Sequence, residues 1–403
     1  MSDGILDGVR IVEWGEFVSG PWTSRLLADM GADVIKIEQP RLGDSARRAG
    51  PFPGDIPDPE KSGLFLYLNW NKRSMSLDLN RPESRAVFDK LVLTADVFIE
   101  NHPPSYLRDR GISYESLQRI NPELLMVSLS PFGQTGPHSD YAASELILFH
   151  AGGIGYETPI GEVTDRVHQQ PLKGPGYQSY FMAGWVAALS TFVGLFHKQV
   201  NGVGQYIDIS EQEAIASTQR PNVTRYSYAE EVYHREAAGG ARFKPCKDGY
   251  FAGFGALGND GMWQKLCAVM GNPEWTKNQS YDNQASRREK AGEIDPKIAE
   301  WMMDYTKAEL FEMGQQGGLS CFPVNTVEDV YATEQYRYRG FFQEIEHPIA
   351  GSYAYPGIPF HFSSNQPSIR VRAPFLGEHT LEILRELGLS EQEIKALQSA
   401  EII

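Results

Sequence analysis

The chain has 403 residues, of which 41% are hydrophobic and 22% charged, as in an ordinary globular protein of two domains or one large unit. Its formal net charge of -15 disfavours nucleic acid and anionic membranes as partners. The same charge means that an anionic substrate requires a locally basic site.

The three cysteines carry no signature of a metal or disulfide site. Cys246, Cys267 and Cys321 are far apart, and neither a CxxC pair nor a His-rich spacing accompanies them. We therefore expect buried, reduced thiols, no metal and a cytoplasmic protein. The first residues, which lack a basic and apolar export pattern, agree with this localisation.

The N-terminal part of the chain predicts a βαβ unit. Residues 9–14 form a short apolar run and residues 15–21 contain turn formers. Helical spacing continues to Gly31, and residues 34–37 are expected to form a second strand. Further strands are expected at 74–79, 97–99, 124–129 and 205–209, with helices between them. This alternation predicts an α/β fold with a parallel, doubly wound sheet.

A dinucleotide-binding fold is the obvious alternative, because Glu38 ends the second strand where a ribose-binding acid would stand. The required G-x-G-x-x-G turn is absent, since Gly15 and Gly20 are too far apart and Glu16 would repel a pyrophosphate. We therefore do not expect a nucleotide-dependent oxidoreductase.

Two longer stretches complete the organisation. Residues 180–196 carry no formal charge but contain many small residues, so we expect a fully buried core helix rather than a membrane span. Composition shifts near residues 237–242. We predict a large domain over 1–225, a small α+β domain over 226–335 and a return to the large domain over 336–403.

Many short motifs, in order along the whole chain, resemble those of the class III CoA-transferases, the formyl-CoA and carnitine CoA-transferase family. They include Leu6–Arg10, Gly31–Glu38, Asn71–Ser74, Phe132–Pro137 and Ala373–Thr380. The resemblance implies a Rossmann-like large domain built from both chain ends, with an inserted small domain. It also implies an interlocked dimer in which domains of both chains enclose each active site.

The resemblance also identifies a missing residue. In the family's active-site segment, a Gly-Gly turn is followed at a fixed spacing by a nucleophilic Asp and then by Gly-x-x-Ala-Ala-Leu. Here Gly152-Gly153 and Gly184–Leu189 keep that spacing without a gap, and Gly174 occupies the nucleophile position. The family's aspartate attacks the acyl-CoA thioester and forms a mixed anhydride, which glycine cannot do.

Other positions implied for CoA binding have also changed. Family cations are replaced at Gln39, Asn80, Asp109 and Ala142, although Arg108 and Arg110 leave room for compensation. The remaining positions of this degenerate CoA site are Val18, Ser19, Asn101 and His102. A glycine-rich segment with Gly253, Gly255, Gly258 and Asn259 resembles the family loop that closes over the acyl intermediate, although a plain strand-to-helix turn reads the same way.

Two substitutes for the missing aspartate can be considered. Family racemases use a His-Asp step, but Ser144-Glu145 and Gly174 stand at those places, so a racemase is disfavoured. A displaced nucleophile would come from a remodelled loop, with Glu157, Glu162, Asp165, Tyr177, Gln178 and Ser179 nearby in sequence. His102 and His138 are more simply explained as loop residues.

We therefore expect a catalytically silent subunit of a hetero-oligomeric CoA-transferase, similar to two-subunit members that activate aromatic succinates. A paralogous subunit that carries the Asp would be the partner, and this chain would complete the partner's active site. CoA would move from an acyl-CoA, with succinyl-CoA the expected donor, to an acid such as an aryl-succinate, without a bound cofactor. The alternatives are a self-sufficient homodimer with a displaced nucleophile and a non-catalytic scaffold.

Overall fold

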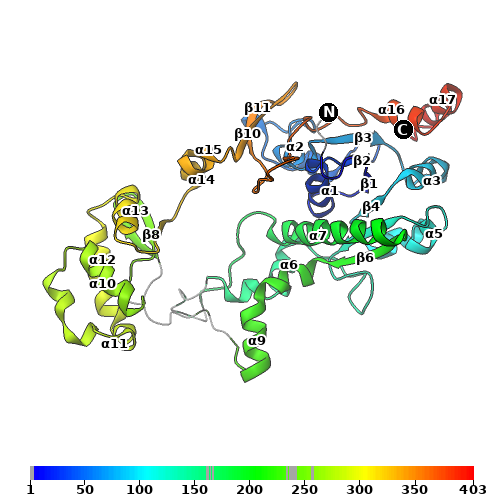
Figure 1. Cartoon of the computed structure of the whole chain (residues 1–403). Coiled ribbons are helices and arrows are strands. Elements are labelled where there is room, and N and C mark those ends of the chain that lie inside the picture. Colours follow the sequence, from blue (N-terminus) through cyan, green and yellow to red (C-terminus); the bar gives the residue numbers. More distant parts are fainter. Residues whose placement is uncertain are drawn as a thin grey trace. The chain divides into compact units, whose positions relative to one another are not determined.

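The structure is a computed structural model, which describes residues 4–159, 163, 165, 168–232, 235, 243–255 and 258–403. The chain forms two compact units, whose elements are labelled in Figure 1. Unit 1 comprises Met1–Ile154, Gly174–Arg220 and Arg337–Ile403, and unit 2 comprises Gly155–Lys173 and Pro221–Tyr336. Unit 2 thus includes Gly155–Lys173, a segment that our prediction placed in the large domain.

Unit 1 is built on a six-stranded parallel sheet with the strand order β3-β2-β1-β4-β5-β6. The strands are β1 (Arg10–Trp14), β2 (Asp33–Glu38), β3 (Lys72–Ser76), β4 (Val97–Glu100), β5 (Leu125–Ser130) and β6 (Gln205–Ser210). This is the doubly wound order of a Rossmann-like fold, so the predicted fold class is confirmed.

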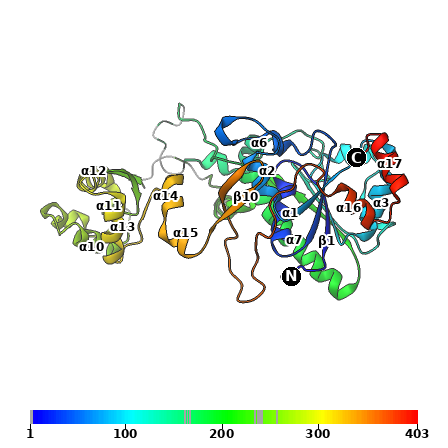
Figure 2. The same ribbon diagram turned by 90° about the horizontal axis from the view of Figure 1, so that it is seen from above.

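Helices cover both faces of this sheet (Figure 2). Along β4, Val97 and Ile99 pack in the core beneath α1 (Ser19–Asp29) and α7 (Gln178–Asn201). Phe98 points the other way, into the core beneath α3 (Arg85–Thr94), α16 (Thr380–Glu386) and α17 (Glu391–Ser399). Strands buried on both faces read as continuous apolar runs, and the C-terminal helices complete the second layer.

Helix α7 corrects one expectation, because it is buried on one face only. Small residues, including Ala183, Gly184 and Ala187, pack it against α1, β5 and β6. Large apolar side chains on its other side are exposed, namely Trp185, Leu189, Val193, Phe196 and Val200. By length and composition alone α7 could span a membrane, but its packing against the sheet makes it a layer of an α/β core.

Unit 2 has its own core. A three-stranded antiparallel sheet of β7 (Phe243–Cys246), β8 (Gly249–Ala252) and β9 (Phe322–Pro323) is joined by α10 (Asp260–Val269), α12 (Ala291–Met302) and α13 (Lys307–Gln316). Cys246, Cys267 and Cys321 are buried in it, as predicted. Among the described residues, no cluster of His, Cys, Asp or Glu side chains could hold a metal ion.

Candidate active site

A cavity of about 380 Å³ lies in unit 1 at the carboxyl ends of the strands, where doubly wound sheets bind ligands. The loops after β1 and β4, residues 139–143 and the starts of α7 and α8 (Glu211–Ala216) supply most of its wall. Five of the eight predicted CoA-site positions meet there: Val18, Ser19, Asn101, His102 and Ala142. Gln39, Asn80 and Asp109 are not part of the wall.

Asn101 fixes the loop that forms one side of this cavity. Its Oδ1 accepts a hydrogen bond of 2.8 Å from the Glu16 amide, and its Nδ2 donates to the Glu16 carbonyl at 2.8 Å and to Ser19 Oγ at 3.0 Å. A Cβ on Gly20 would lie 3.2 Å from the Asn101 side chain. The glycines of this turn thus permit a close approach to Asn101, which explains why their spacing differs from that of a dinucleotide-binding turn.

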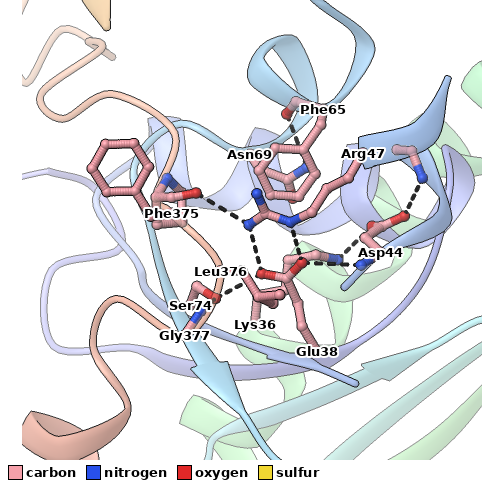
Figure 3. Close-up of polar contacts among 12 residues, drawn as sticks. Lys36, Glu38, Asp44, Arg47, Phe65, Asn69, Ser74, Phe375, Leu376 and Gly377 are labelled. Carbon is pink, nitrogen blue, oxygen red and sulfur yellow. Dashed lines mark hydrogen bonds and ion pairs between the residues drawn. The ribbon is translucent and has the colours of Figure 1, made fainter. Parts of the chain in front are cut away.

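Beneath the same loop lies a buried ion network that contains Lys36, and Figure 3 shows Lys36 and Asp44 beside the Glu38–Arg47 pair. Lys36 Nζ lies 2.7 Å from Glu13 Oε1 and 2.8 Å from Asp44 Oδ2, and it donates to the Gly15 carbonyl at 2.7 Å. Asp44 in turn accepts from the Phe17 amide at 2.8 Å. Although burial opposes ionisation, Lys36 and Lys72 lower the pKa of Glu13 to about 2. Lys36 therefore holds the cavity wall from below and is not directed at a ligand.

Both carboxylate oxygens of Glu38 are hydrogen-bonded within the protein. Its two oxygens accept from Arg47 Nε at 2.7 Å and Nη2 at 2.9 Å, and also from Ser74 Oγ at 2.6 Å (Figure 3). Ser74 Oγ accepts from the Gly377 amide at 2.8 Å, which ties the C-terminal signature segment to the sheet. A carboxylate bonded in this way cannot bind a ribose, so the structure also removes the dinucleotide alternative.

His102 is a neutral part of the cavity wall. Its ring lies 4.1 Å from the Trp14 ring and 5.0 Å from that of Tyr106, between centroids. Burial lowers the pKa of His102 to about 3, so the ring carries no charge at neutral pH. His102 thus offers no cation to a phosphate.

Two carboxyl groups, Glu16 and Glu211, line the cavity, whereas its wall contains no Lys or Arg among the described residues. Burial raises the pKa of Glu211 to about 7. Burial, together with the nearby Asp44, also raises the pKa of Glu16. Sequence reasoning missed Glu211 as a site residue, because an acidic residue at the start of a helix resembles an ordinary helix-terminal charge.

Three of the altered CoA positions lie around Arg110. The Asn80 amide donates to Gln39 Oε1 at 3.2 Å, and Asn80 Oδ1 accepts from both Tyr106 Oη and Arg110. The Arg110 guanidinium lies 3.3 Å from the Tyr106 ring centroid. Asp109 is exposed beside it, and Arg108 pairs with Asp140 at 2.7 Å. Both flanking arginines therefore already have partners within the chain.

Gly174 is close to a side chain from the start of α7. A Cβ built on it would lie 2.6 Å from Nε2 of Gln178 and 3.0 Å from Oε1. Of the possible substitutes, Glu157 is bonded to the Asn222 amide and Asp165 to His168, whereas Glu162 lies outside the described residues. At the racemase position, Glu145 accepts from the amides of Ser179 and Tyr180 and so caps α7.

The glycine-rich segment in unit 2 has structural contacts of its own. Gly253 has a φ of +104°, and a Cβ there would lie 2.5 Å from the Ser320 carbonyl oxygen. The Gly258 carbonyl accepts from Arg287, and the Asn259 side chain caps α10 by accepting from the Met262 amide at 2.9 Å. The part at residues 256–257 lies outside the described residues. These contacts give Gly253 and Asn259 structural roles, and the functional role of the loop remains a prediction.

The family model of CoA-transferase family III matches residues 6–380. The chain belongs to this family.

Named relatives span nearly the whole chain. The chain is 34% identical to the succinyl-CoA:(R)-benzylsuccinate CoA-transferase subunit BbsE of Thauera aromatica, over 94% of this chain and 93% of the relative. It is 31% identical to the formyl-CoA:oxalate CoA-transferase of Afipia carboxidovorans, over 98% and 96%. The same identity, over 96% of both chains, relates it to the succinate–glutarate CoA-transferase of Agrobacterium fabrum.

Solved structures agree with this assignment. A CAIB/BAIF family protein from Brucella suis superposes with a TM-score of 0.83 at 29% identity, covering 95% of this chain and 99% of the other. Rv3272 from M. tuberculosis superposes with a TM-score of 0.79 at 23% identity, over 94% and 99%, which supports the fold alone. CoA-transferases use CoA thioesters as substrates and need no other cofactor. The cavity in unit 1 is therefore the candidate site for CoA in this family III member.

Proposed function

We propose that this chain is the catalytically silent subunit of a hetero-oligomeric class III CoA-transferase, and that a paralogous subunit supplies the nucleophilic aspartate. The observation that carries the proposal is Gly174, where the amide of Gln178 fills the space in which a nucleophile would begin. A backbone glycine has no carboxylate with which to attack a thioester. The name of the BbsE relative, which describes a subunit, supports an assembly of different chains.

In the proposed assembly the partner's aspartate carries the acyl chemistry. It attacks the thioester carbonyl, releasing CoA thiolate and forming a mixed anhydride. The thiolate attacks the aspartyl carbonyl, which frees the donor acid and leaves an aspartyl-CoA thioester. The acceptor carboxylate then attacks that thioester, which releases CoA thiolate and forms a second mixed anhydride. The thiolate finally attacks the acyl carbonyl of the acceptor, which gives the new acyl-CoA and frees the aspartate. Both anhydrides require shielding from water, which this chain would provide by completing the partner's site.

The exposed face of α7 supports the need for a partner chain. Leu189 and Phe196 are each 68% exposed, and Val193 and Val200 lie on the same side. Soluble proteins seldom leave such a contiguous apolar surface in water, so it fits an interface between subunits. An interlocked arrangement of the two chains, as the family resemblance implies, would cover it.

The names of the relatives suggest the substrates. Benzylsuccinate, oxalate and glutarate are carboxylic acids, and succinyl-CoA appears as the donor of the BbsE-containing enzyme. We propose succinyl-CoA as donor and an aryl-succinate as acceptor for the complex. The chain itself would need no cofactor and would act in the cytoplasm.

The test is an assay of the chain alone and with its paralogue. We expect no conversion of succinyl-CoA and benzylsuccinate by the chain alone, and conversion by the co-purified complex. Replacing the partner's aspartate with asparagine should abolish that activity. Turnover by the chain alone would instead support a displaced nucleophile, and a complex whose rate equals that of the partner alone would support a scaffold.

A further inference from the structure

The charge of the cavity in unit 1 is opposite to what a phosphate-bearing ligand requires. Glu16 and Glu211 line it, and no Lys or Arg does among the described residues. We infer that Glu16 and Glu211 are specificity-determining residues that exclude CoA from this chain's own cavity. The assembled enzyme would then bind one CoA for each pair of subunits, in the partner's cavity. This inference rests on the proposed function and adds to it the residues and the stoichiometry.

The backbone of Glu16 is fixed at the cavity wall. Both its amide and its carbonyl are held by the Asn101 side chain at 2.8 Å. Beneath it, Lys36 Nζ contacts Glu13, Asp44 and the Gly15 carbonyl. Its charge acts on Glu16, but burial and Asp44 still raise the pKa of Glu16. The half-buried carboxyl of Glu16 therefore stays where a ligand would pass.

Glu211 faces the same space from the start of α8. Its side chain is only 3% exposed and is hydrogen-bonded to Ser19, another residue of the wall. It forms no ion pair with any described Lys, Arg or His. Because burial raises the pKa of Glu211 to about 7, this carboxyl is about half ionised at neutral pH and ionised above it. Its charge then adds to the repulsion that Glu16 produces, because charges in a partly buried site are poorly screened by salt.

The other nearby cations already have partners within the chain. Arg48, whose charge acts on Glu16, donates to the Leu42 carbonyl at 2.6 Å and is not part of the cavity wall. Arg110 donates to Asn80 Oδ1 and to the Tyr106 carbonyl, and Arg108 pairs with Asp140. His102 on the wall has a pKa lowered by burial and is neutral. A diphosphate brought to this cavity would meet two acids without a cation of the wall to hold it.

The first experiment uses the unaltered complex. Isothermal titration and native mass spectrometry with CoA should give one CoA for each pair of subunits. Two CoA molecules for each pair would overturn the inference. This measurement requires no variant and so does not depend on how a variant folds.

The second experiment uses the chain alone. We expect the wild-type chain to bind CoA more weakly than about 1 mM, and the double variant Glu16→Gln/Glu211→Gln to bind it at least about tenfold more tightly. Glu213→Gln, an exposed residue of the same helix α8, is the matched control and should change nothing. Pantetheine, which lacks the phosphates, should not distinguish the wild type from the double variant.

Equal binding of CoA by the wild type and the double variant would overturn the inference. That result would leave the proposed function intact if neither chain turns over alone. Turnover by the chain alone would reject the proposed function instead, so the two failures are distinguishable.

Discussion

The side-chain amide of Gln178 lies against Gly174, where a Cβ would be 2.6 Å from Nε2 and 3.0 Å from Oε1. The obstacle is the far end of a flexible side chain, and Gly174 does not adopt the left-handed backbone conformation that only glycine tolerates well. A side chain can therefore be introduced at position 174 if the end of the Gln178 side chain moves.

Gly174→Asp should therefore fold almost normally, with a free energy of unfolding within about 1 kcal/mol of the wild type. Urea denaturation provides the measurement. Gly204→Ala is a suitable contrast, because its Cβ would lie 2.1 Å from the Leu124 carbonyl oxygen, and it should cost at least about 2 kcal/mol. If both variants are equally destabilised, the space at Gly174 is not available as described.

Restoring the nucleophile should not by itself restore activity. Gly174→Asp alone should show no CoA transfer, because Glu16 and Glu211 still line the cavity. The triple variant with Glu16→Gln and Glu211→Gln should bind CoA and, when mixed with succinyl-CoA, form an acyl or CoA adduct on residue 174 that intact mass detects. An adduct in the single Gly174→Asp variant would show that the two acids do not exclude CoA.

The close contact of α1 with α7 depends on Gly184. A Cβ there would lie 2.6 Å from Trp22 Cδ1 and 3.0 Å from the Ser19 carbonyl oxygen. Gly184→Ala should therefore lower the free energy of unfolding by roughly 1–3 kcal/mol. Gly292→Ala, within α12 and with nothing inside 4 Å, should instead raise it by about 0.4–1 kcal/mol. Chemical denaturation of the two variants tests this opposite sign.

Glu100 should make stability depend on pH. Burial raises its pKa from 4.5 to about 8, so the folded chain keeps it protonated where the unfolded chain ionises it. Its contribution is complete below about pH 4.5 and is lost as the pH rises through 8, at up to about 1.4 kcal/mol per pH unit. Glu100→Gln should gain stability relative to the wild type over this window, whereas exposed Glu123→Gln should not. If the free energy of unfolding of the wild type, Glu100→Gln and Glu123→Gln changes in parallel with pH, this account is contradicted.

Substitutions of Asn259 distinguish a structural role of the glycine-rich segment from a functional one. Because its side chain caps α10, Asn259→Ala should cost about 1 kcal/mol, whereas Asn259→Asp should keep the cap and the stability. We expect the complex with Asn259→Asp to remain active, since the side chain is already used within this chain. A stable but inactive Asn259→Asp complex would show that the amide itself serves the partner's site.

The sequence predicted the sheet because strands such as Leu125–Ser130, buried on both faces, are short and mostly apolar. Five cavity positions followed from the family resemblance. Glu211 could not be found, because the burial of this residue at a helix start arises from tertiary packing, which its local sequence does not show. The uncharged stretch also did not predict that Phe196 is exposed. Small apolar residues occupy one face of α7 and large ones the other, and packing against the rest of unit 1 determines which face is buried.

The most direct test of the central claim is the covalent intermediate. The complex is mixed with succinyl-CoA, quenched in acid, and the intact masses of the two chains are measured. A catalytically silent subunit predicts an acyl or CoA adduct on the partner chain and an unmodified mass for this chain. An adduct on this chain would contradict the account.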